Sequence, residues 1–126
     1  MTLSPLAPDS FPNLPPIAGI KLSTAASGMR YQGRDDLLLI SLASGSSVAG
    51  VFTQSDTAAA PVSWSRKIAK TGTAAAIITN AGNANAFTGS HGDHAVNAMV
   101  NNLASHLNCD ANAIMVASTG VIGEPL

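Results

Sequence analysis

The stretch that decides the fold is residues 74–86, AAAIITNAGNANA, followed by the helical pattern of residues 93–107, DHAVNAMVNNLASHL. Residues 74–79 form an apolar run of strand length that leads into small, turn-forming residues. In residues 93–107 the apolar side chains recur at helical spacing, which predicts an amphipathic helix with one inward-facing stripe. That stripe consists of Val96, Met99, Val100, Leu103 and Leu107. We expect a buried strand, a turn and a helix in this order.

Upstream of this unit, residues 36–42 have the pattern of a buried strand and residues 43–46 that of a turn. Residues 47–53 are then expected to return as a second strand, which predicts an antiparallel hairpin. A helix is expected over residues 62–70, because Pro61 suits a first helical turn and Gly72 ends the pattern.

Downstream, residues 113–117 form a short apolar run that predicts another buried strand. The whole order is hairpin, helix, strand, helix, strand, which is typical of a mixed α/β (α+β) layered domain. We assign this domain to residues 19–126. Residues 1–18 are expected to be an extended arm, because proline fixes its own backbone and lacks an amide donor. Its apolar residues Phe11, Leu14 and Ile17 are candidates for contact with a neighbouring surface.

The composition is apolar and poor in charge, with 46% hydrophobic and 10% charged residues. A surface with so little charge often binds another subunit. The net charge of −1 and the lack of a basic stretch argue against nucleic-acid binding. No apolar run is long enough to span a membrane, and Cys109 has no second cysteine to pair with. We therefore expect a cytoplasmic protein in which Cys109 fills space as an unreactive thiol.

The first candidate for chemistry is Ser118-Thr119-Gly120, where the last predicted strand ends. The hydroxyl of Thr119 and the amide of Gly120 would suit a developing negative charge, because preorganised donors stabilise an oxyanion. A serine or threonine at such a place also caps the free amides of a following helix. From the pattern alone the cap is the better interpretation.

Two further segments carry polar side chains of interest. Residues 80–85 hold three asparagines that would suit either a polar substrate or a tight turn, and the pattern favours the turn. Residues 91–94, HGDH, contain His91, Asp93 and His94, but metal sites need three or four ligands and no further cluster completes the set. We expect no metal there and a solvated helix start instead. The chain also lacks a glycine-rich dinucleotide fingerprint, a phosphate-binding loop and a nucleophile elbow.

Taken together, four motifs resemble the bifunctional ornithine acetyltransferase (glutamate N-acetyltransferase) family of arginine biosynthesis. They are GVFT at residues 50–53, APV at 60–62, NAGNANA at 80–86 and ASTGVIG at 117–123. The motifs follow the family's order and spacing over nearly the whole chain. The arm motif FPNLPPIAG at residues 11–19 is similar to the bacterial branch. Each motif alone is weak, whereas the ordered set is specific.

This resemblance implies a layered sandwich fold, of which the chain is the N-terminal section of the α chain. It implies a precursor that cuts itself before an internal threonine, which becomes the N-terminus of a companion β chain. The threonine takes an acetyl group from N-acetylornithine and passes it to glutamate, and some members also accept acetyl-CoA. The resemblance further implies a heterotetramer of two α and two β chains, no cofactor, and an oxyanion hole formed here by Thr119 and Gly120.

The chain also departs from the family pattern. The self-cleaving Ala-Thr junction and the substrate-binding lysine and threonine near it are not found in residues 1–126. Only Thr119 and Gly120 therefore carry a role over from the family. Two alternatives stay open at this point: an N-terminal-nucleophile aminopeptidase of similar architecture, and a non-catalytic fragment or binding module.

Overall fold

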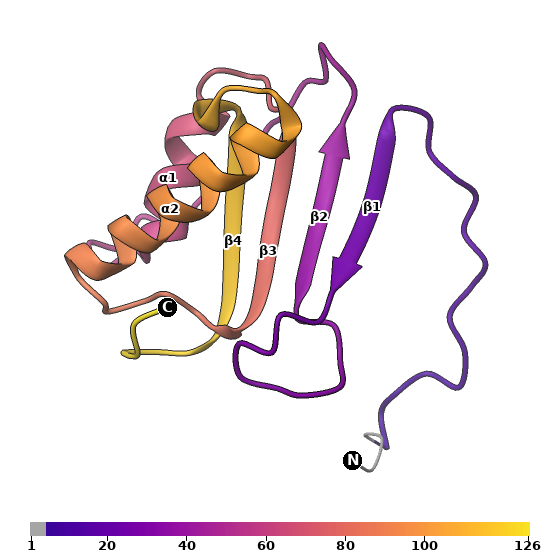
Figure 1. The fold of residues 1–126 in the computed structure, drawn as a ribbon, viewed down its shortest axis with the longest axis horizontal. Coiled ribbons are helices and arrows are strands. Elements are labelled where there is room, and N and C mark those ends of the chain that lie inside the picture. The colour runs from indigo at the N-terminus through magenta and orange to yellow at the C-terminus, as the bar shows by residue number, and fades with distance from the viewer. Residues whose placement is uncertain (1–4) are drawn as a thin grey trace.

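The computed structural model describes residues 5–126, in which a four-stranded sheet is accompanied by two helices (Figure 1). The helix α2 packs on one face of the sheet, over the strands β3 and β4, and the helix α1 runs along the free edge of β4. The elements in chain order are β1 (Ile20–Ala25), β2 (Leu37–Leu42), α1 (Ala60–Ala69), β3 (Ala76–Asn83), α2 (Ser90–Leu107), the short 3₁₀ helix η1 (Ala111–Ala113) and β4 (Ile114–Val121). The predicted mixed α/β class is confirmed.

The strands lie in the order β1-β2-β3-β4, with two antiparallel pairs followed by the parallel pair β3–β4. Residues that lie opposite one another share a face of the sheet. Leu39, Ile78 and Val116 lie opposite one another and belong to the core under α2. The alternate residues therefore form the other face, which no helix among residues 5–126 covers. On that open face Leu22 remains 67% exposed.

The predicted helices and strands are largely confirmed. The helix α1 begins with a proline in its first turn, and α2 begins three residues earlier than expected. In α2, Val96 and Val100 are buried while Met99, Leu103 and Leu107 pack beside them, so the predicted stripe faces the core. The helix ends where Asn108 adopts a left-handed conformation with φ of 50°, which is a common helix terminator.

The predicted hairpin between residues 36–42 and 47–53 is wrong. The strand β2 pairs with β1 and β3, and residues 47–53 form no strand, only an isolated bridge between Ser47 and Thr73. The physical reason lies in the apolar partners that each segment offers. Pairing with β3 places Leu39 beside Ile78 in the core, whereas residues 47–53 lack a period of two and contain a glycine.

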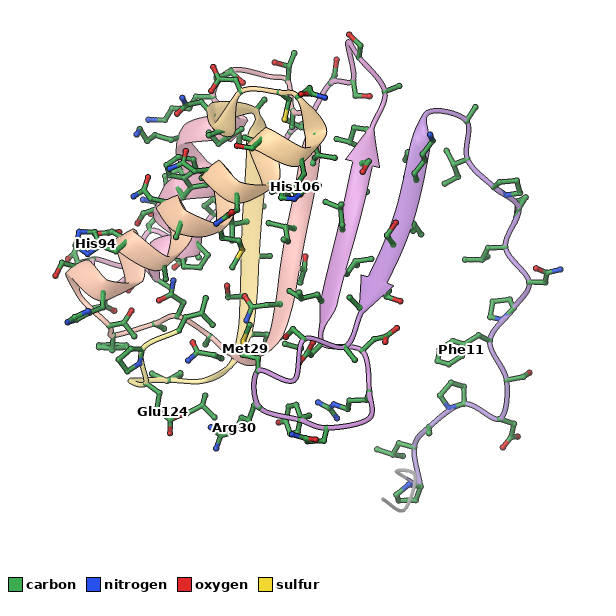
Figure 2. The ribbon with its side chains drawn as sticks, viewed as in Figure 1. Phe11, Met29, Arg30, His94, His106 and Glu124 are labelled. Carbon is green, nitrogen blue, oxygen red and sulfur yellow. The ribbon has the colours of Figure 1, made fainter. Side chains whose placement is uncertain are left out.

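Residues 5–19 contain neither helix nor strand and run past the outer strand β1 (Figure 1). Phe11, Leu14 and Ile17 are 85%, 76% and 66% exposed, so the predicted contact with a neighbouring surface is not made within residues 5–126 (Figure 2). The predicted arm also includes residues 1–4, which lie outside the described residues. Its separation from the domain at residue 18 stays a prediction. In the described part of the chain, no helix combines the length and hydropathy that a bilayer crossing requires.

Candidate functional site at the ends of the parallel strands

Thr119 and Gly120 lie inside β4, near its end, because both strands of the parallel pair run further than the sequence predicts. The strand β3 continues to Asn83 and β4 continues to Val121. No helix follows β4 within residues 122–126, so the helix-cap interpretation of Thr119 is wrong. The carboxyl ends of parallel strands are where open α/β sheets bind ligands. The segment is therefore placed where a site is expected.

Gly120 allows the two strands to approach each other unusually closely. Its φ is +133° and the φ of its partner Gly82 is +120°, both in the region that favours glycine. A Cβ atom on Gly120 would lie 2.3 Å from the carbonyl carbon of Gly82 and 2.6 Å from the amide nitrogen of Asn83. The close approach coincides with a register shift between Gly82 and Asn83. Only glycine fits at position 120.

The side chain of Thr119 is available to a ligand. It is exposed and has no side-chain hydrogen bond to any of residues 5–126. Because side chains alternate along a strand, Thr119 points to the open face, opposite to the buried Val116. A hydroxyl without an internal partner at a strand end can donate a hydrogen bond to an anion.

The three asparagines of residues 80–85 point inward. Asn80, Asn83 and Asn85 are 0%, 7% and 0% exposed. The Oδ1 atom of Asn80 accepts a hydrogen bond from Ser118 at 2.6 Å, and the Nδ2 atom of Asn85 donates to the carbonyl of Gly92 at 3.0 Å. Their amide groups are thus engaged inside the protein and are not presented to a substrate. The predicted turn is displaced, since Asn80 and Asn83 belong to β3 and only Asn85, with φ of 46°, has a turn conformation.

The residues before β2 form a loop that sequence reasoning missed. Asp36 is 3% exposed, and its carboxylate accepts hydrogen bonds from the amides of Ser27 and Met29. The hydrogen bond from the Ser27 amide is the main reason why the pKa of Asp36 lies below its ordinary value of 3.8. The same loop brings Arg30 to Glu124, with 2.9 Å between Nη1 and Oε2 (Figure 2). The only sequence signal for this loop was the position of Asp36 at the start of a predicted strand.

The remaining candidates are placed away from the strand ends. His91, Asp93 and His94 are exposed in the first turns of α2, and no three His, Cys, Asp or Glu side chains within residues 5–126 form a metal-binding group (Figure 2). The thiol of Cys109 is half-buried. Burial, and secondly the charge of Asp110, raises its pKa, which agrees with an unreactive thiol.

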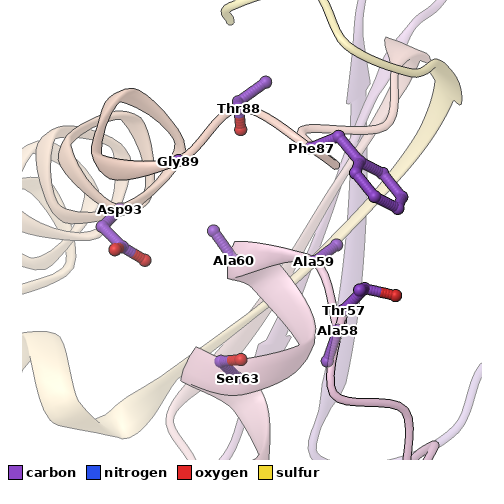
Figure 3. A pocket seen from close by; sticks show the side chains of 9 residues that line it. All are labelled: Thr57, Ala58, Ala59, Ala60, Ser63, Phe87, Thr88, Gly89 and Asp93. Carbon is purple, nitrogen blue, oxygen red and sulfur yellow. The ribbon is translucent and has the colours of Figure 1, made fainter.

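A cavity of about 350 Å³ lies where the N-terminal ends of α1 and α2 meet (Figure 3). Its walls include Ala60, Ser63 and Asp93, and the side chain of Phe87 lies at its margin. Phe87 is 70% exposed and has φ of 57°. Nothing in the sequence pattern indicated this cavity, because its walls come from two segments, residues 57–63 and 87–93, that lie far apart in the sequence.

The fold and the strand-end site together define an α/β protein with a hydroxyl and a glycine backbone displayed beside a parallel strand pair. Comparison with known proteins gives the family: the ArgJ family model matches residues 21–126, and the chain belongs to that family. It is 52% identical to the arginine biosynthesis bifunctional protein ArgJ of Nitrobacter winogradskyi over 98% of its length. It is 48% identical to the protein of the same name from Bradyrhizobium diazoefficiens.

Solved structures agree with this assignment. Ornithine acetyltransferase of Mycobacterium tuberculosis, in complex with ornithine, is similar with a TM-score of 0.82 and 36% identity. The match covers 86% of this chain and 60% of that one. The ArgJ structure of Bacillus halodurans has a TM-score of 0.80 at 34% identity, with coverages of 86% and 57%. The chain spans 31% and 30% of the lengths of the two curated relatives.

Proposed function

We propose that the chain is part of an enzyme of arginine biosynthesis that transfers an acetyl group from N-acetylornithine to glutamate. Thr119 and Gly120 stabilise the oxyanion of the tetrahedral intermediate. The observation that carries this proposal is the exposed hydroxyl of Thr119, unbonded within residues 5–126, beside the close approach of Gly120 to Gly82 at the ends of β3 and β4. Membership of the ArgJ family and the likeness to a solved ornithine acetyltransferase support it.

The chemistry needs a nucleophile from outside these residues. A threonine at the N-terminus of a companion chain, released by self-cleavage of the precursor, attacks the acetyl carbonyl of N-acetylornithine. Its own amine accepts the hydroxyl proton and later passes a proton to the departing ornithine amine. The carbonyl oxygen becomes negative during attack, and Thr119 and Gly120 stabilise it there. The acetyl ester is then attacked by the amine of glutamate, which gives N-acetylglutamate and frees the threonine.

The assembly belongs to the same proposal. The remainder of the precursor covers the open face of the sheet, on which apolar side chains such as Leu22 and Ile20 remain partly exposed. Exposed apolar surface of this kind usually marks a contact with another chain. Two α and two β chains form a heterotetramer in the cytoplasm.

Acetyl-CoA is a second acetyl donor, used as a substrate, and no cofactor is required.

The experiment uses the complete protein, including the companion chain, with N-acetylornithine and glutamate as substrates. We expect N-acetylglutamate and ornithine in equal amounts, and one acetyl group on the N-terminal threonine when glutamate is left out. Intact-mass analysis detects that acetyl-enzyme. Amide hydrolysis without transfer to glutamate would contradict the proposal and favour an aminopeptidase instead.

A further inference from the structure

We propose that Asn80 is a positioning residue which, through Ser118, sets the backbone of Thr119 and Gly120 for oxyanion binding. This inference rests on the function proposed above. Asn80 is fully buried and lies opposite Ser118 in the parallel pair, two positions before Gly82 and Gly120, after which the register shifts. It acts through its neighbours, since a fully buried side chain cannot reach a substrate.

The amide group of Asn80 joins three separate parts of the chain. Its Oδ1 atom accepts a hydrogen bond of 2.6 Å from the Ser118 hydroxyl on β4. Its Nδ2 atom donates to the carbonyl of Asn83, at the end of its own strand, at 2.8 Å. The same Nδ2 atom lies 3.5 Å from the Sδ atom of Met29, in the loop before β2. The oxygen and the nitrogen of one rigid, planar amide group therefore both form hydrogen bonds.

These contacts coincide with the irregularity that shapes the candidate site. Asn83 lies opposite both Thr119 and Val121, and the register shifts between Gly82 and Asn83. Asn83 follows Asn80 by three residues on the same strand. The hydrogen bond from Asn80 to the carbonyl of Asn83 therefore lies at this register shift. Gly120 meets Gly82 at the same point. The amide of Asn80 thus fixes the bulge against which the Thr119-Gly120 segment rests.

Ser118 transmits this constraint to the candidate oxyanion residues. It directly precedes Thr119, and adjacent side chains on a strand point to opposite faces. Anchoring the Ser118 side chain on the inner face therefore fixes the direction of Thr119 on the open face. Oxyanion donors must be held within about 0.5 Å of their productive position. An aspartate at position 80 would keep the acceptor but lose the donor, and an aliphatic residue would lose both.

The test measures the rate constant of acetylation in the complete enzyme, separately from the amount of active enzyme. In a single turnover with N-acetylornithine, the amplitude counts folded, competent sites and the rate constant reports the chemistry. We expect Ser118→Ala and Asn80→Asp to lower this rate constant roughly 10- to 100-fold. Ser118→Thr retains the hydroxyl and should stay near the native rate constant. The matched control is Asn102→Asp, which removes an exposed Nδ2 donor to the carbonyl of Ala98 on α2.

A merely structural role would lower the amplitude and leave the rate constant unchanged, and that result in both variants would overturn the inference. A second measurement does not depend on activity. The amide signal of Gly120 in the NMR spectrum of the complete protein should move in Asn80→Asp and keep its native position in Asn102→Asp. An unmoved Gly120 signal would also overturn the inference. Absence of acetyl transfer by the native protein would instead count against the proposed function, and the Gly120 signal would still decide the role of Asn80.

Discussion

Gly120 lies directly against Gly82, so that a Cβ atom on Gly120 would stand 2.3 Å from the carbonyl carbon of Gly82. A real Cβ atom essentially never comes within 3.0 Å of such a neighbour. This close approach lies at the ends of β3 and β4, where the exposed hydroxyl of Thr119 also lies. The consequences of this relationship can be measured by substitution.

Gly120→Ala should destabilise the complete protein by more than about 3 kcal/mol, because it combines a backbone clash with a strained φ. The matched control is Gly123→Ala, at φ of 83° with no atom within 4 Å of the added Cβ. The control meets only the cost of the left-handed conformation, about 1–2 kcal/mol. Thermal and denaturant unfolding measure both. Equal losses in the two variants would show that the close approach to Gly82 does not exist.

Ser65→Ala should cost about 2–3 kcal/mol of unfolding free energy. The buried Oγ atom of Ser65, on α1, donates to the carbonyl of Val116 at 2.7 Å and accepts from the amide of Val116 at 2.8 Å. The substitution leaves both backbone groups on the edge of β4 without a partner. Ser63→Ala, at an exposed position of the same helix, should change stability by less than about 0.5 kcal/mol. A loss at Ser65 no greater than at Ser63 would contradict the edge-capping role.

Asp36 should make stability depend on pH in the acidic range. Its pKa is lower in the folded protein than its ordinary value of 3.8, chiefly because of the Ser27 amide. Its stabilising effect is therefore complete above pH 3.8 and is lost as the pH falls through the lower folded-state pKa. Asp36→Asn should be less stable than the native protein near neutral pH, and the difference should shrink on acidification. Denaturant unfolding across this range measures it, and a constant difference would contradict the assignment.

The open face of the sheet should make residues 1–126 associate when they are produced alone. Leu22 is 67% exposed there and lies opposite Ile40 in the neighbouring strand. Equilibrium sedimentation should show oligomers or aggregates, and Leu22→Lys should shift the population toward the monomer. A folded monomer of the native sequence, stable at high concentration, would argue strongly against a covering partner chain.

Much of the fold could be predicted from the sequence, because local patterns determine it. The spacing of the apolar residues from Val96 to Leu107 fits only a helix, and Pro61 marks the first turn of α1. Strand pairing was harder, because it depends on which distant segment offers the better apolar partner. The strand β1 was not predicted, although residues 20–23 alternate between apolar and polar side chains, so its pairing with β2 was missed as well.

The candidate site was only partly predictable. Thr119 and Gly120 were found from their motif, but the pattern could not distinguish a strand from a helix cap. The inward direction of Asn80 depends on contacts with Met29 and Ser118, which lie 51 and 38 residues away in sequence. No local pattern contains that information.

The proposed role of Thr119 is to stabilise the oxyanion of acetyl transfer. The most direct measurement is the single-turnover acetylation rate constant of the complete enzyme with N-acetylornithine, for Thr119→Ala and Thr119→Ser. Loss of the hydroxyl should lower the rate constant roughly a hundredfold or more, with little change in ground-state binding. Thr119→Ser keeps the donor and should retain more activity than Thr119→Ala. A native rate constant for Thr119→Ala would contradict the oxyanion role.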